Sequence, residues 1–139
     1  MTAAIQKYYS DISVGMSTTC EKQITHDDVQ AFANISRDHN PLHLDDEFAR
    51  NTIFGERIAH GMLTASYIPA AMITLTGPGW IYINQSLEFR APVKIGEIVT
   101  TYVEVKKCIP EKNFVELITE CSVKGTIVIK GMATVKSPD

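Results

Sequence analysis

The stretch SRDHNPLHLD, residues 36–45, holds two histidines and two aspartates around an Asn-Pro step. Asp38 and His43 are five residues apart, which would put them on different faces of a regular helix. Pro41 interrupts a regular helix and disfavours the helical conformation for Asn40, so a turn can bring the two side chains to one point. A carboxylate and an imidazole that converge on one water molecule form a general acid/base pair at neutral pH.

Two other interpretations of this stretch stay open. Asp and Asn side chains often bond nearby backbone amides, so an Asp-x-Asn-Pro step is also ordinary turn chemistry. His39, His43 and Asp45 have side chains that bind metals. However, Pro41 lies between the two histidines and removes the shared helix face that such a pair normally uses. We therefore expect no metal and no cofactor.

Cysteine chemistry is not indicated. The three cysteines, Cys20, Cys108 and Cys121, lie in or at the ends of strand-like segments, have no neighbouring histidine and form no C-x-x-C pair. They are typical of buried free thiols in a reducing compartment.

The composition is that of one soluble globular domain over residues 1–139, with 45% hydrophobic and 21% charged residues. The net charge is −3 and no dense Lys/Arg run occurs, so we expect no nucleic-acid partner. The opening segment MTAAIQKYYSDI lacks the continuous apolar block of a secretory signal, and the apolar stretch at 62–75 is too short to span a bilayer. We expect a cytoplasmic protein without a membrane partner.

Two short helices are expected around the decapeptide. A β-type run at 17–25 leads into THDDVQAFANIS, where Thr25 is a candidate N-cap with Asp28 three residues on. Apolar residues at helical spacing predict a helix ending near Ser36. Residues 37–44 should form a turn or extended loop, and residues 45–51 a second helix whose three acids suit a helix N-terminus.

A longer helix without charges follows the loop IFGERIAHG. It starts at Gly61, continues through MLTASYIPAAMITLTGPG and stops at Gly77-Pro78. A helix without a charged face is buried on most sides, and Pro69 predicts a kink or boundary within it. The backbone N–H of Gly61 would be unsatisfied and aimed by the helix dipole, although this glycine is equally suited to turning the loop into the helix.

The remainder of the chain is strand-like. Four segments rich in β-branched and aromatic residues are separated by turns, namely WIYINQSLEFRAPV, EIVTTYVEVKKC, FVELITECSVK and GTIVIKGMATVK. Strands that follow one apolar helix predict an α+β fold, in which an antiparallel sheet is covered by that helix.

These features together resemble the MaoC-like (R)-specific enoyl-CoA hydratases of the PhaJ type. The resemblance rests on DHNPLHLDDEFARNTIFGERIAHGMLTAS, on the uncharged helix and on SLEFRAPVKIGE, and it extends from about Gly15 to Val135. It implies a hot-dog fold, in which an antiparallel sheet wraps around a long central helix, and a homodimer of such subunits. It also implies reversible syn addition of water to a trans-2-enoyl thioester of CoA or of an acyl carrier protein, which yields the (3R)-3-hydroxyacyl thioester.

The resemblance also implies roles for individual residues. Asp38 would act as base on the water that attacks C3, while His43 would help to hold that water and supply the proton to C2. The amide of Gly61 would meet the charge that develops on the thioester oxygen. Asn40, which we group with the substrate-binding residues, matches a motif position where an amide can brace the loop together with Asp38 and His43.

Three further residues lie near the start of the uncharged helix. We expect Met62 and Ser66 to line the substrate pocket. A histidine at a loop–helix junction is usually a hydrogen-bonded packing residue, and we interpret His60 in that way.

Two alternative functions fit the same fold. Hot-dog thioesterases commonly place a carboxylate on the central helix, and residues 62–76 contain no Asp or Glu, so hydrolysis is disfavoured. A non-catalytic acyl-thioester-binding module would need the pocket but not Asp38 and His43, and the presence of both argues against it. The sequence does not rank the candidates for binding the carrier phosphates, which are Arg37, Arg50, Arg57, Arg90 and Lys94.

Overall fold

The computed structural model describes residues 5–139. Its helices are η1 (Tyr9–Asp11), α1 (His26–Ser36), α2 (Pro41–Leu44), α3 (Asp46–Arg50), α4 (Gly61–Ala65) and α5 (Tyr67–Thr76). Its strands are β1 (Ser17–Gln23), β2 (Ile81–Gln85), β3 (Glu88–Phe89), β4 (Ile98–Ile109), β5 (Phe114–Val123) and β6 (Thr126–Lys136). None of the helices in this range has the length and apolar character needed to cross a membrane. The expectation that the opening segment is no secretory signal falls partly on residues 1–4, which lie outside the described range.

The strands form one antiparallel sheet in the order β1-β4-β5-β6-β2, with β3 paired to β6. Strands β4, β5 and β6 follow one another along the chain as two long hairpins. The β5–β6 turn passes through Lys124 and Gly125, both at positive φ, which a tight two-residue hairpin requires. Every second residue of β5 is buried, so the sheet has one core face and one outer face.

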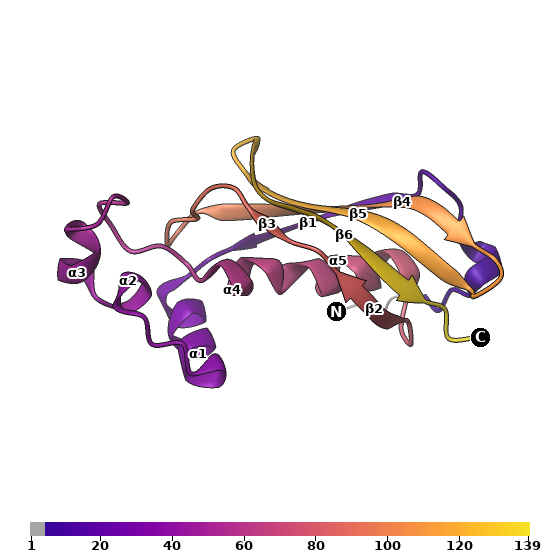
Figure 1. Cartoon of the computed structure of the whole chain (residues 1–139), viewed down its shortest axis with the longest axis horizontal. Coiled ribbons are helices and arrows are strands. Elements are labelled where there is room, and N and C mark those ends of the chain that lie inside the picture. Colours follow the sequence, from indigo (N-terminus) through magenta and orange to yellow (C-terminus); the bar gives the residue numbers. More distant parts are fainter. Residues whose placement is uncertain (1–4) are drawn as a thin grey trace.

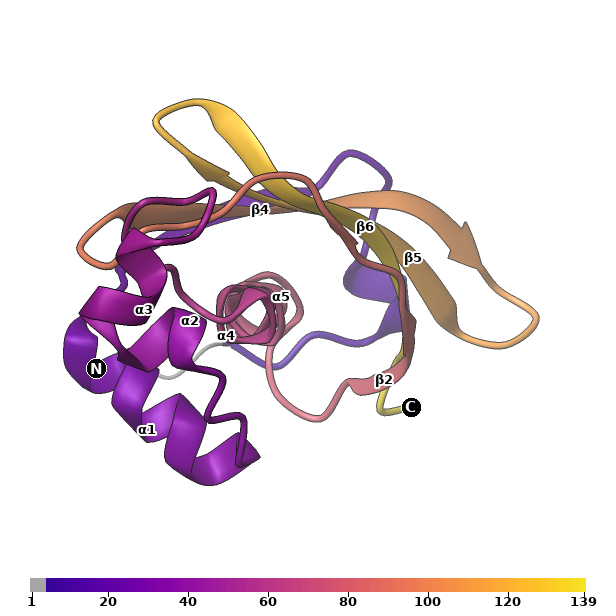
Figure 2. The same cartoon turned by 60° about the vertical axis from the view of Figure 1, so that its left-hand side comes forward.

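The uncharged segment forms the central helix, made of α4 and α5. Figure 2 looks along this helix and shows the sheet curving around it, with α1, α2 and α3 on the side that the sheet leaves open. In Figure 1 the helix runs along the inner face of the sheet. Ala71 and Leu75 of α5 belong to one buried cluster with Val103 of β4 and Leu117 of β5. The expected α+β fold, with the sheet wrapped around the central helix, is confirmed.

The central helix is interrupted close to Pro69, as the sequence predicted. Helix α4 ends at Ala65 and α5 starts at Tyr67, while Ser66 between them keeps right-handed helical angles (φ −63°, ψ −15°). Pro69 has no N–H to donate to the carbonyl of Ala65. The helical ladder therefore breaks one turn before the proline, and the chain continues in nearly the same direction.

The helices before the loop follow their sequence signals. Thr25 and Asp28 form a reciprocal capping box at the start of α1, because each side chain accepts a hydrogen bond from the other residue's backbone N–H. Asp45 caps α3 by accepting from two backbone amides. The helix predicted over residues 45–51 is thus confirmed as α3, with Asp45 as its N-cap and not its first residue.

Residues 41–44 depart from the prediction. Pro41 is the first residue of helix α2, a position where the missing N–H sacrifices no hydrogen bond. Asn40 is the N-cap, and its side-chain oxygen accepts from the backbone N–H of Leu42 at 3.1 Å. The expected turn or extended loop over 37–44 is therefore right for its first four residues and wrong for the last four.

The segment WIYINQSLEFRAPV, predicted as one strand, forms the two strands β2 and β3. The carbonyl of Ser86, between them, lies so close to Gly131 of β6 that a Cβ has no room there. The pairing of β2 with β6 shifts register between Tyr82 and Asn84. A bulge inserts one residue and so changes which side chains share a face. As a result, Tyr82 and Gln85 are both partly buried.

Candidate active site

The loop after α1 is built by short-range hydrogen bonds. Arg37 ends α1 in the left-handed conformation (φ 64°), which turns the chain toward the central helix. The Asp38 backbone N–H donates to Ser36 Oγ at 3.1 Å, and Asp38 Oδ1 accepts from the Asn40 backbone N–H at 3.1 Å. The turn chemistry suggested by the sequence is therefore present, and it occupies one oxygen of the Asp38 carboxylate.

His43 lies on α2 and is 7% exposed. Its Nδ1 is 2.8 Å from the backbone carbonyl oxygen of Ile58. A carbonyl only accepts, so Nδ1 carries the hydrogen, and in the neutral ring Nε2 carries the lone pair. Helix α2 is tied to its neighbours by Arg57, whose Nε donates to Asp46 at 2.7 Å and whose Nη1 donates to the His43 carbonyl at 3.5 Å.

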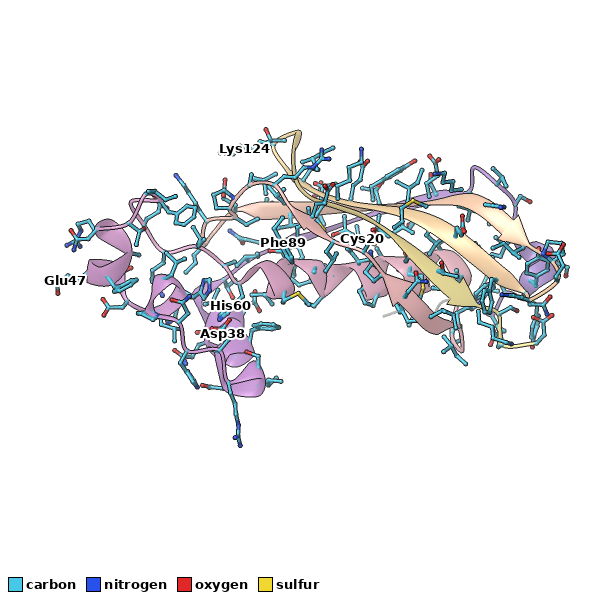
Figure 3. All side chains as sticks on the ribbon, viewed as in Figure 1. Cys20, Asp38, Glu47, His60, Phe89 and Lys124 are labelled. Carbon is cyan, nitrogen blue, oxygen red and sulfur yellow. The ribbon has the colours of Figure 1, made fainter. Side chains whose placement is uncertain are left out.

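Asp38, His43 and His60 converge. One carboxylate oxygen and one ring nitrogen from each histidine all lie within 4.8 Å of one another. Asp38 is exposed, whereas both histidines are buried. Figure 3 shows Asp38 and His60 next to each other where the loop meets the start of α4. The structure thus brings together the two residues proposed from the sequence and adds a third.

His60 was interpreted from the sequence as a packing residue, and it does pack. Its ring lies 4.9 Å from that of Phe32 and 4.0 Å from that of His43. Its Nε2 donates to the backbone carbonyl of Asp38 at 3.0 Å, while Nδ1 is buried without a partner among the described residues. Burial lowers the pKa of His60, and the nearby His43 acts in the same direction, while the bond to the Asp38 carbonyl opposes both. The available sequence signal was its position next to Gly61.

The metal alternative considered from the sequence is not assembled. Within residues 5–139, the one group of three such side chains is Asp38, His43 and His60. His39 is exposed and lies outside that group, and Asp45 caps α3 instead. In both buried histidines of the group, one ring nitrogen already bonds a backbone carbonyl.

Gly61 lies beside this group as the first residue of α4, and His60, its N-cap, gives no side-chain capping bond. The first backbone N–H groups of a helix have no intrahelical acceptor, and no acceptor among residues 5–139 bonds that of Gly61. A Cβ at this position would lie 2.6 Å from Phe89 Cδ1. Only glycine therefore allows the aromatic ring to lie against the helix start. A hollow of about 250 Å³ opens here, lined by Asp38, His60, Gly61, Met62 and Phe89.

A second, mainly apolar hollow of about 470 Å³ adjoins the first across Met62. It is lined by Phe32, Met62, Ala65, Ser66, Pro69, Tyr82, Gln85 and Leu87. Met62 and Ser66 both line this hollow, whereas Asn40 lines neither hollow and instead caps α2. Tyr82 and Gln85 are not predicted from the sequence, because the bulge that turns both inward has no local sequence signal. Burial raises the pKa of Tyr82 to about 12.

The chain is similar to known proteins over most of its length. The model of the MaoC like domain matches residues 11–134. The (R)-specific enoyl-CoA hydratase of Rhodospirillum rubrum is 49% identical over 96% of this chain and 94% of its own length. The 3-hydroxybutyryl-CoA dehydratase of Methylorubrum extorquens is 48% identical over 94% of this chain and 84% of its own length. The solved structure of R-hydratase PhaJ1 from Pseudomonas aeruginosa in the unliganded form superposes with a TM-score of 0.90 at 40% identity, over 96% of this chain and 87% of that one. The chain belongs to the MaoC-like domain family.

Proposed function

We propose that this protein is a hydro-lyase that adds water reversibly to a trans-2-enoyl-CoA and forms the (3R)-3-hydroxyacyl-CoA. The observation that carries the proposal is the approach of Asp38 and His43 to within 4.8 Å of each other, beside the Gly61 amide, which bonds no acceptor among residues 5–139. Relatives that are nearly half identical over almost the whole chain are named for this chemistry or its reverse. In this proposal the single domain expected from the sequence carries out the whole reaction.

In the proposed steps, Asp38 and His43 end in the protonation states in which they began. Asp38 takes one proton from the water as its oxygen bonds C3, and protonated Nε2 of His43 gives a proton to C2. The water oxygen reaches C3 and the proton reaches C2 from the same side of the double bond, so addition is syn. The charge that moves onto the thioester oxygen meets the Gly61 amide. Asp38 then returns its proton to His43 Nε2, which is free to accept it because Nδ1 stays bound to the Ile58 carbonyl.

In this proposal the two hollows hold different parts of the substrate. The smaller one holds the reacting carbons beside Asp38. The larger one receives the acyl chain, because its lining is mainly apolar and Met62 joins it to the first. Met62 and Ser66 are the residues that we assign to substrate binding, and Asn40 braces the catalytic loop through its bond to Leu42.

Arg90 is the best-placed candidate for the carrier phosphates. It lines a third hollow of about 350 Å³ that meets the first at Gly61 and Phe89. Its side chain is 48% exposed, and its partner Glu88 is exposed as well. Arg57 is only 16% exposed and is bound to Asp46. We assign CoA rather than an acyl carrier protein as the carrier, in line with the names of the two relatives.

We also propose a homodimer in the cytoplasm. Strand β2 is an edge of the sheet, and Ile81 and Ile83 on it are 56% and 46% exposed. An edge strand with exposed apolar side chains favours pairing with a second copy. The three cysteines are all free, which favours a reducing compartment.

The test is the loss of enoyl ultraviolet absorbance when the protein is mixed with crotonyl-CoA. We expect absorbance to fall without release of free thiol, and chiral chromatography of the hydrolysed product to show (3R)-hydroxybutyrate. Release of CoA thiol would instead support the thioesterase, for which α4 and α5 offer no carboxylate. Binding without any absorbance change would support the acyl-thioester-binding module.

A further inference from the structure

We infer that His60 is a positioning residue of the active site, which holds the carboxylate of Asp38 and the imidazole of His43 at a fixed spacing. The inference rests on the proposed hydratase function. It assigns His60 a part in the reaction in addition to its packing role.

The first link runs from His60 to the loop. Nε2 donates to the Asp38 backbone carbonyl at 3.0 Å, across 22 residues of sequence. It supplements the short-range turn bonds, which join Asp38 only to Ser36 and Asn40. Those bonds set the shape of the loop, whereas the bond from His60 ties the loop to the start of the central helix. The carboxylate is therefore held relative to Gly61, the neighbour of His60.

The second link runs from His60 to the other catalytic candidate. The His60 and His43 rings lie 4.0 Å apart at an interplanar angle of 31°. The His43 ring is also held by the hydrogen bond from its Nδ1 to the Ile58 carbonyl. A ring fixed by one hydrogen bond can still swing about it, and the packed His60 ring restricts this motion. The His60 side chain thus contacts the backbone of Asp38 and the ring of His43.

The hydrogen bond also fixes the tautomer of His60. Its acceptor is a carbonyl, so the neutral ring carries its hydrogen on Nε2 and a lone pair on Nδ1. His60 is 2% exposed, and Nδ1 has no partner among residues 5–139. His60 therefore serves as a neutral donor in the arrangement. If it were protonated, it would place a positive charge against the ring that must carry the catalytic proton.

A matched set of variants separates positioning from packing. In His60→Gln the side-chain amide can reach the place of Nε2 and keep the bond to the Asp38 carbonyl. His60→Phe keeps an aromatic ring of similar size but loses that bond. His39→Gln alters an exposed histidine of the same loop and serves as the control. Each is assayed with crotonyl-CoA beside the wild type, and folding is checked by thermal unfolding.

For His60→Phe we expect kcat to fall by about 10- to 100-fold with KM within about threefold, because losing positioning affects the chemical step more than substrate binding. His60→Gln should recover most of the lost kcat, and His39→Gln should match the wild type. Equal kcat in His60→Phe and wild type, or equal losses in His60→Gln and His60→Phe, would overturn the inference.

A second measurement is independent of activity. Side-chain ¹⁵N chemical shifts of the labelled protein report which ring nitrogen carries hydrogen, and we expect the Nε2–H tautomer for His60. The Nδ1–H tautomer would overturn the inference even if the enzyme is active. An inactive wild type with the Nε2–H tautomer would instead count against the proposed function and leave the arrangement standing, so the two failures can be told apart.

Discussion

The imidazole rings of His43 and His60 lie against each other at a tilt, with centroids 4.0 Å apart and planes inclined by 31°. Two imidazoles at this separation do not readily carry charge together, because like charges disfavour each other's ionised form. The proposed reaction needs a proton on His43, so His60 has to remain neutral. Burial lowers the pKa of His60 and thereby favours the neutral form.

This lowered pKa predicts a pH dependence of stability. The ordinary value for histidine is 6.5, and the folded value is lower. Below 6.5 the unfolded chain binds a proton at His60 more readily than the folded protein does, so stability is lost as pH falls from 6.5 toward the folded pKa. Above 6.5 both states are neutral at this residue and the contribution is constant. Asp38, His39 and His43 are the titratable groups facing it.

The measurement is chemical denaturation of wild type and His60→Gln between pH 5 and pH 8. We expect the stability difference between the two proteins to change below about pH 6.5, in favour of the variant, and to be flat above it. A difference that is constant across the whole range would contradict the assignment of a lowered pKa to His60.

Removing either proposed proton-transfer group should abolish most of the activity. Asp38→Asn keeps a side-chain oxygen for the Asn40 N–H but loses the base, and His43→Gln loses the proton donor. We expect kcat to fall by about 10² to 10⁴ in each, or roughly 3 to 5 kcal/mol of barrier. Steady-state kinetics with crotonyl-CoA measures this, and an unchanged unfolding midpoint in Asp38→Asn shows that the turn is intact. Near-normal turnover in either variant would remove that residue from the mechanism.

Sequence patterns predicted the parts of this site that depend on near neighbours. The spacing of Asp38, Asn40 and His43 around a proline indicated that the two titratable side chains could converge, although it placed His43 in a turn and not on helix α2. The role of Pro41 was only half visible, since proline both ends a helix and starts one.

The parts that were missed depend on contacts between distant segments. His60 joins the group through a hydrogen bond across 22 residues and through the contact of its ring with that of His43 on α2. Tyr82 and Gln85 share a face only because β2 bulges against β6. Neither the contacts of His60 nor the shared face of Tyr82 and Gln85 can be predicted from the local pattern of apolar and polar residues.

A side chain at position 61 should fit only if the Phe89 ring moves. A Cβ at position 61 would lie 2.6 Å from Phe89 Cδ1 and 2.7 Å from Cε1. We expect Gly61→Ala to displace the ring or the helix start and to lower kcat/KM for crotonyl-CoA by about 10- to 100-fold, through the misplaced amide donor. The double variant Gly61→Ala/Phe89→Ala should recover part of this loss, with Phe89→Ala alone as its reference. Additive losses in the double variant would show that the two residues are not coupled.

Ser66 should influence the length of acyl chain that the enzyme accepts. It lines the 470 Å³ hollow at the break between α4 and α5, where its hydroxyl donates to the Leu63 carbonyl. In Ser66→Leu the added side chain should shorten the hollow. We expect kcat/KM for trans-2-octenoyl-CoA to fall at least about tenfold further than that for crotonyl-CoA, the difference that about 1.4 kcal/mol of lost binding gives. Equal effects on both substrates would place the acyl chain elsewhere.

The proposed dimer predicts a concentration-dependent assembly that a charge on strand β2 disrupts. Ile81 and Ile83 are exposed on this sheet edge, and a charged lysine on an edge strand opposes edge-to-edge pairing. Analytical ultracentrifugation should show twice the chain mass of 15.4 kDa for the wild type and a shift toward the monomer for Ile83→Lys. Ile35→Lys on α1, which is 84% exposed, is the matched control and should sediment like the wild type. A wild type that stays monomeric at micromolar concentration would contradict the dimer and leave the grouping of Asp38, His43 and His60 within one chain unaffected.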